Sequence, residues 1–163
     1  SKFSSCKTYF NSISEFENLL SQNDYKSILT NMFSSMFFSN VHKHHKIRIV
    51  NRAIKIPKMY SLPLRRNTIW YDSHCVENNL KNLHLPLLVL QSTKMDKIKG
   101  RTCIKKNEIN SYVEFVKNCS KTVKVNLFEN TGHYITIEKP QVVNKIIKDW
   151  LIDLKIHFRE QHS

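Results

Sequence analysis

Two short strand-like runs, separated by a helical pattern and followed by a long amphipathic stretch, constrain the fold of this chain most strongly. Residues 85–91 form a continuous apolar run, which is typical of a strand buried on both faces of a sheet. Residues 122–128 alternate between polar and apolar side chains and are rich in β-branched residues, which indicates a second strand. Residues 108–117 and the stretch that begins at Pro140 have helical spacing. This order predicts an α/β fold in which the two strands are parallel.

The first half of the chain shows helical spacing and no comparable strand pattern. Its apolar residues predict helices over 10–20, 25–38, 43–55 and 74–82. Pro57 and Pro63 interrupt the pattern between the third and the fourth of these helices. We place the boundary near His84, which divides the chain into a helical segment, 1–84, and an α/β segment, 85–163.

The sequence contains only two glycines, Gly100 and Gly132. The dinucleotide-binding Gly-x-Gly-x-x-Gly, the phosphate-binding loop and the Gly-x-Ser-x-Gly of serine hydrolases each need at least two glycines a few residues apart. None of these motifs can be written with the glycines present. We therefore predict no cofactor, and no serine nucleophile of the usual kind within these residues.

The four cysteines lie far apart in the sequence, at Cys6, Cys75, Cys103 and Cys119. They form no Cys-x-x-Cys pair, so we expect reduced thiols and neither a zinc site nor a disulfide framework. No apolar run approaches the roughly 20 residues that a membrane-spanning helix needs, and no signal peptide begins the sequence. These features predict no transmembrane segment and favour a cytoplasmic location.

Basic residues outnumber acidic ones, with 26 Lys and Arg against 13 Asp and Glu, which gives a formal net charge of +13. Such a charge attracts polyanions non-specifically. The lysines are spread along the chain, and the densest basic stretch, 42–48, contains no aromatic residue that could stack on a base. We interpret this stretch as a solvated helix face and predict no specific nucleic-acid partner. Phosphate contact and metal binding by its three histidines are the alternatives.

Two titratable residues follow the predicted strands, at the edge of a parallel sheet where chemistry usually takes place. Asp96 lies five positions after Gln91, and His133 follows the second strand beside Gly132. An aspartate that accepts the Nδ1 proton of a histidine fixes its tautomer, and that histidine can serve as general base and then general acid. On spacing alone, Asp96 could equally be a turn residue and His133 a surface or core residue.

The segments PLLVLQST, residues 86–93, and NTGHYITIEKP, residues 130–140, resemble the final third of α/β-hydrolases. In that family, the acid of the catalytic triad follows the seventh strand. A Gly-His-aromatic stretch followed by Glu-x-Pro carries the triad histidine and begins the last helix. The resemblance covers about residues 85–152, with Asp96 at the acid position and His133 at the base position.

The resemblance implies a partial α/β-hydrolase fold, in which a helical cap (1–84) precedes the last βαβα of the core (85–163). In this family the nucleophile comes before the acid and the histidine. We therefore expect the C-terminal part of a longer hydrolase, inactive alone, with the nucleophile in a missing N-terminal half. An ester-like small molecule is the expected substrate, and whether the nucleophile is Ser or Asp stays open. The alternative is a non-catalytic basic binding module derived from a hydrolase.

Other polar residues near these segments have simpler interpretations. We expect Glu138 to be a helix-start residue, with Glu138 and Asp72 as substitute acids, and Ser92 and Thr93 to form hydrogen bonds in a loop. Aromatic residues of the helical segment fit ordinary core positions better than the lining of an apolar pocket. These residues are Phe33, Phe37, Phe38 and Trp70.

Overall fold

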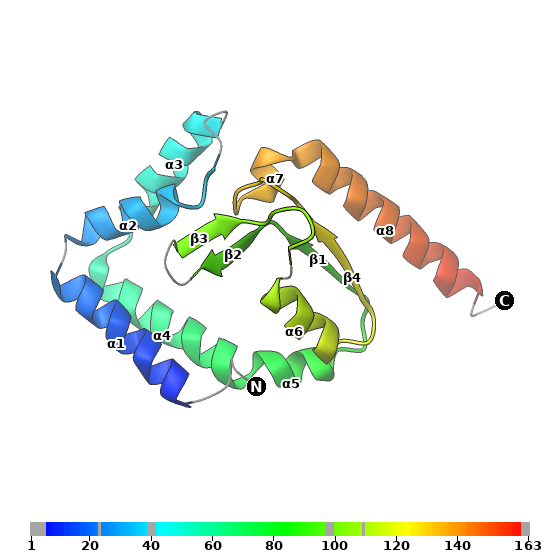
Figure 1. The fold of residues 1–163 in the computed structure, drawn as a ribbon, viewed down its shortest axis with the longest axis horizontal. Coiled ribbons are helices and arrows are strands. Elements are labelled where there is room, and N and C mark those ends of the chain that lie inside the picture. Colours follow the sequence, from blue (N-terminus) through cyan, green and yellow to red (C-terminus); the bar gives the residue numbers. More distant parts are fainter. Residues whose placement is uncertain (1–5, 23, 39–41, 97–99, 109, 161–163) are drawn as a thin grey trace.

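The computed structural model describes residues 6–22, 24–38, 42–96, 100–108 and 110–160. Its helices and strands are α1 (Cys6–Gln22), α2 (Tyr25–Ser34), α3 (Lys43–Ala53), α4 (Lys58–His74), α5 (Val76–Lys81), β1 (Leu87–Gln91), β2 (Thr93–Asp96), β3 (Gly100–Cys103), α6 (Ser111–Cys119), β4 (Val123–Leu127), α7 (Ile135–Glu138) and α8 (Pro140–Glu160). Every strand in these ranges follows α5, so a helical half precedes a mixed α/β half (Figure 1).

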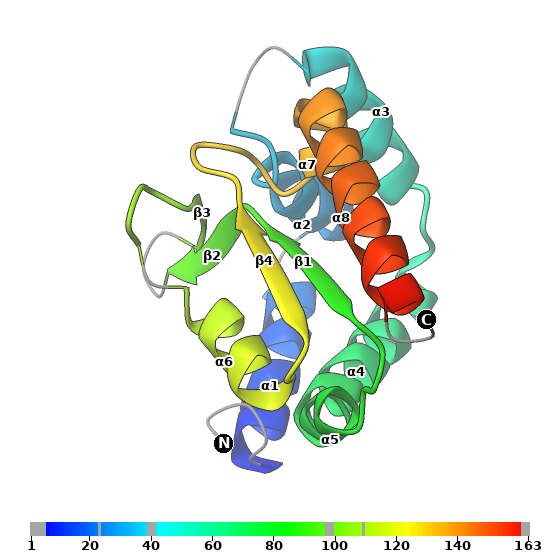
Figure 2. The same cartoon turned by 90° about the vertical axis from the view of Figure 1, so that its right-hand side faces the viewer.

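The strands β1 and β4 form a parallel pair that organises the second half of the chain. Leu87 lies opposite Val123 and Gln91 lies opposite Leu127 in this pair. The two strands run side by side, with α6 and α8 on opposite sides of them (Figure 2). This arrangement confirms the mixed α/β class and the parallel pairing. The connecting helix begins at Ser111, later than predicted, and residue 109 lies outside the described residues.

Apolar side chains from β1, from the residue after β4, from α7 and from α8 form a core cluster beside the sheet edge. The cluster consists of Phe128, Ile135 and Val143, with Leu90, Ile146 and Ile147 packed against it. Val143 is 1% exposed, which places the first turns of α8 firmly on the sheet. On the other side of the strands, α6 buries Val113 and Val116. The predicted start of the last helix at Pro140 is confirmed, since proline is tolerated in a first turn.

The helix α4 differs from the prediction, because it continues through Pro63. A proline inside a helix removes one backbone hydrogen bond and costs about 3 kcal/mol. Contacts with α1 lie on both sides of Pro63. The Lys58 ammonium donates to the Leu20 carbonyl at 3.2 Å, and Arg66 forms an ion pair with Glu17. Tertiary packing therefore decides the structure of this segment against its local preference.

A second difference is the antiparallel hairpin of β2 and β3, where the sequence indicated a loop. Thr93 pairs with Cys103 and Asp96 pairs with Gly100. Gly100 has a φ of +72°, a left-handed conformation that glycine adopts without a steric penalty. Asp96 is therefore the last residue of a strand, not a residue of an irregular loop.

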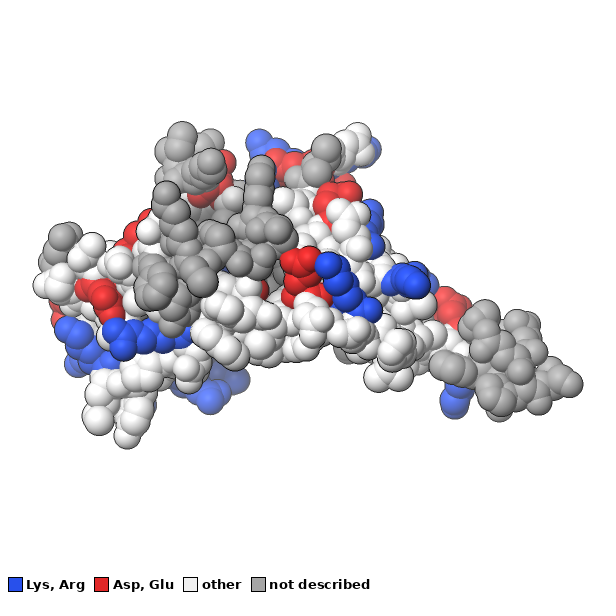
Figure 3. Space-filling view, turned by 90° about the horizontal axis from the view of Figure 1, so that it is seen from below, with Lys and Arg blue, Asp and Glu red and all other residues white. Residues whose placement is uncertain are grey.

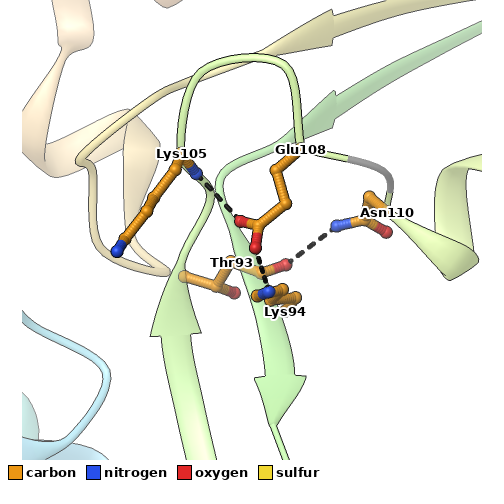
Figure 4. Close-up of polar contacts among 5 residues, drawn as sticks. All are labelled: Thr93, Lys94, Lys105, Glu108 and Asn110. Atoms are coloured by element: carbon orange, nitrogen blue, oxygen red, sulfur yellow. Dashed lines mark hydrogen bonds and ion pairs between the residues drawn. The ribbon is translucent and has the colours of Figure 1, made fainter.

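Polar contacts fasten the segment between β3 and α6 to β2 (Figure 4). The Glu108 carboxylate accepts the backbone N–H of Lys105 at 3.0 Å and forms an ion pair with Lys94. The hydrogen bond from Lys94 is the main reason that the pKa of Glu108 is lowered. The Asn110 amide donates to the Thr93 carbonyl at 3.4 Å. These contacts hold the hairpin beside the first turn of α6.

The surface of the described residues shows no feature that identifies a partner by itself. No helix in these parts of the chain is both long enough and apolar enough to cross a bilayer. Cys75, Cys103 and Cys119 are free thiols. On the face seen in Figure 3, basic side chains form several separate groups with acidic side chains between them.

Candidate active site

The carboxyl ends of β1 and β4 meet at one edge of the sheet, and hydrogen bonds join the segments that follow them. The Ser92 hydroxyl donates to the Gly132 carbonyl at 2.7 Å, and this contact is buried. The Phe128 N–H donates to the Gln91 carbonyl at 2.8 Å. The predicted base, His133, comes next in the loop after β4. It therefore lies at the edge where open α/β sheets bind their ligands.

Gly132 is required at this edge because there is no space for a side chain. A Cβ added to Gly132 would lie 2.0 Å from Glu138 Oε1 and 2.7 Å from the Met36 carbonyl oxygen. Gly132 itself has no positive φ. The structure assigns a left-handed angle in this loop to Asn130 instead, whose φ is 51°.

Glu138 lies at the end of the short helix α7 and supports the loop that carries His133. Its Oε2 accepts the Gly132 N–H at 2.9 Å. Its Oε1 is buried and has no hydrogen-bond partner among the described residues. The contacts of Glu138 therefore position the Gly132 backbone, in addition to its place in the first turn of α7 and two residues before α8. Asp72, the other substitute acid, is exposed on α4.

The helical half reaches the site through the residues that follow α2. The His133 N–H donates to the Met36 carbonyl at 2.8 Å. The adjacent rings of Phe37 and Tyr134 are stacked, with their centroids 4.8 Å apart. The helical half and the α/β half thus meet at the candidate base.

The aromatic residues of the helical half divide between core and surface. Phe37 is buried and Phe33 is half-buried. Phe38 and Trp70 are 43% and 50% exposed, so the expected core role fails for both. The Trp70 ring stacks on His74 of the same helix.

The polar neighbour of the His133 ring is Arg101 of β3. Arg101 Nη1 lies 3.4 Å from His133 Nδ1 and 3.0 Å from Thr93 Oγ1. A guanidinium donates hydrogen bonds and cannot accept them, so Nδ1 accepts in this contact. The neutral ring then carries its proton on Nε2. In a catalytic triad, by contrast, Nδ1–H donates to a carboxylate.

Charge and burial both favour the neutral form of His133. Partial burial lowers the pKa of His133, and the positive charge of Arg101 lowers it further. Burial also lowers the pKa of Arg101 and raises that of Tyr134, whose ring packs edge-on against His133 with centroids 5.5 Å apart. Neutral His133 is the form that a general base requires at neutral pH.

Asp96, the predicted acid, is half-buried at the end of β2. Among the described contacts, the His133 ring meets Arg101 and no carboxylate. The structure thus brings together His133, Arg101 and the Ser92 loop, and it describes no contact between Asp96 and His133. Sequence analysis missed Arg101. Gly100 was the signal in the sequence that could have indicated a hairpin. A hairpin at this point places the next residue, Arg101, beside β2.

The chain matches no protein-family model, no curated protein and no solved structure. Within the described residues, no three potential metal ligands gather in one place. Function is therefore inferred from the residues at the carboxyl edge of β1 and β4.

Proposed function

We propose that this chain supplies the acid and the base of an α/β-hydrolase that cleaves esters or related acyl compounds. His133 is the general base, Asp96 orients it, and a serine nucleophile comes from an N-terminal half outside this sequence. One observation carries the proposal: the buried 2.7 Å hydrogen bond from Ser92 to Gly132 joins the segments after two parallel strands. In open α/β folds, that edge is where ligands bind.

The proposed reaction has two steps. The serine oxygen bonds to the acyl carbon while His133 Nε2 takes the serine proton, and this proton passes to the departing alkoxide as the ester bond breaks. Water then attacks the acyl-enzyme, His133 takes its proton, and the serine oxygen receives that proton as the acid leaves. Without the nucleophile and an oxyanion hole, the present chain has no ester-hydrolase activity.

The proposal requires His133 to leave its contact with Arg101. In that contact Nδ1 accepts a hydrogen bond and Nε2 already carries a proton, so Nε2 cannot take another from serine. Catalysis needs the other tautomer, with Nδ1–H donating to Asp96. The complete site must therefore exchange Arg101 for Asp96 at His133.

A non-catalytic basic binding module is the second candidate function. The contact between Arg101 and His133 favours it, because a cation lies where a triad needs a carboxylate. This function predicts a chain that folds alone and binds polyanions less tightly as the salt concentration rises.

The two functions are separated by the transcript upstream of the Ser1 codon and by ester turnover of the protein that it encodes. The hydrolase predicts an upstream Gly-x-Ser-x-Gly between a strand and a helix, and a loss in kcat on the order of 10³-fold or more in His133→Ala. The matched variant His84→Ala, at an exposed position, keeps full turnover. A stop or start codon directly upstream, or undiminished turnover in His133→Ala, refutes the hydrolase.

A further inference from the structure

The guanidinium of Arg101 is held at one nitrogen and has a second edge without a described partner. Nη1 donates to Thr93 Oγ1 at 3.0 Å and contacts His133 Nδ1 at 3.4 Å. Nε and Nη2, the side-on edge of the group, donate to none of the residues that the structure describes. Two parallel N–H groups on that edge match two oxygens of one carboxylate or phosphate.

The charge of Arg101 also has no counter-ion within the described residues. Some basic side chains of the α/β half do have one, such as Lys94 with Glu108 and Lys124 with Asp153 at 3.0 Å. Arg101 is half-buried, and a charge taken partly out of water costs free energy unless it is paired. An anion supplied by a ligand would remove this cost.

We infer that Arg101 and His133 bind a small oxyanion, that is, the carboxylate or phosphate group of a ligand. The contacts with Thr93 and His133 fix the plane of the guanidinium, so its free edge is already oriented for two hydrogen bonds. Because Nδ1 of His133 accepts from Arg101, Nε2–H adds a donor on a solvent-accessible ring.

This anion site does not depend on the hydrolase proposal, because it needs no nucleophile. It uses the contact between Arg101 and His133, which a catalytic triad would have to break. In a hydrolase, the same site would select acyl substrates that carry an anionic group. Anion binding is measured without turnover, so failure of one proposal is distinguishable from failure of the other.

The test is a titration of the full ¹⁵N-labelled chain with inorganic phosphate and, separately, with sodium acetate, at an ionic strength held constant with chloride. Nuclear magnetic resonance follows the Arg101 Nε–H and the ring nitrogens of His133. We expect saturable shifts of both residues with at least one anion. Arg101→Gln weakens binding by about tenfold or more, since hydrogen bonds to charged groups are strong.

Arg52→Gln is the matched control, because it removes the same charge from an exposed position on α3. We expect it to change the affinity by less than about twofold, as for exposed charges at a distance. Arg101→Lys keeps the positive charge but lacks the two parallel N–H donors of the guanidinium, so we expect it to weaken anion binding as well. It provides the comparison if urea unfolding shows that Arg101→Gln is not folded.

Saturation by phosphate alone identifies a phosphate site, and saturation by acetate alone identifies a carboxylate site. Either result supports the inference. The inference is refuted if neither anion gives saturable shifts, or if Arg52→Gln weakens binding as much as Arg101→Gln does. That last result would assign the binding to the general attraction of a chain with a net charge of +13. An unchanged anion affinity in Arg101→Lys would refute the pair of hydrogen bonds from Nε–H and Nη2–H.

Discussion

Replacing Gly132 by alanine tests the packing that holds His133 at the sheet edge. The added Cβ would lie 2.0 Å from Glu138 Oε1 and 2.7 Å from the Met36 carbonyl oxygen. The end of the Glu138 side chain can rotate away. The Met36 carbonyl cannot, because it belongs to the backbone and accepts the His133 N–H at 2.8 Å. The loop must therefore move, and with it the candidate base.

The expected loss of stability follows from two contributions. Forcing one methyl group into a well-packed site costs about 1–3 kcal/mol. Displacing Glu138 weakens its hydrogen bond from the Gly132 N–H, and a hydrogen bond to a charged group contributes about 1.5–3 kcal/mol. The two do not add fully, because a shift that relieves the clash preserves part of the bond. We expect Gly132→Ala to lower the free energy of unfolding by about 2–4 kcal/mol.

Urea unfolding followed by circular dichroism measures this loss, with Gly100→Ala as the matched control. Gly100 has a φ of +72°, but a Cβ there meets nothing within 4 Å, so alanine costs only backbone strain of about 1–2 kcal/mol. Gly132→Ala should also cost less when Glu138 is alanine, although the Met36 clash persists. Wild-type stability of Gly132→Ala, or a loss no larger than that of Gly100→Ala, would refute the steric reasoning.

Three further predictions concern the site and its support. Arg101→Gln raises the pKa of His133, measured by NMR titration of its ring, although burial keeps it below the ordinary value. Because the folded state disfavours protonated His133, stability falls as pH drops through the ordinary histidine pKa of about 6.5, and this fall is smaller in Arg101→Gln. Asn110→Ala removes the acceptor that caps α6 and costs about 1 kcal/mol in urea unfolding. Ile104→Ala, at a 1% exposed position, lowers the free energy of unfolding by about 2–5 kcal/mol. A smaller loss would mean that neighbouring side chains fill the cavity left by the isoleucine.

Local pattern was sufficient for β1, β4 and the start of α8 in the α/β half, but not for the hairpin of β2 and β3. The apolar run 85–91 and the alternating run 122–128 became β1 and β4, whose pairing satisfies their backbone groups and covers part of their side chains. Their parallel pairing followed from the helix between them, which returns the chain to the same end of the sheet. The position of His133 at the carboxyl edge follows from that pairing.

Tertiary structure decided the rest, because the deciding contacts join residues far apart in the sequence. The helix α4 continues through Pro63 against its local preference, in contact with α1. The hairpin at Gly100 carries Arg101 back to the ring of His133, which no spacing in the sequence indicates. The constraint on Gly132 is the space taken by Glu138 and Met36, which are distant from each other in the sequence. Residue types and their order therefore predicted the place of His133 in the fold, and long-range packing determined which charge its ring meets there.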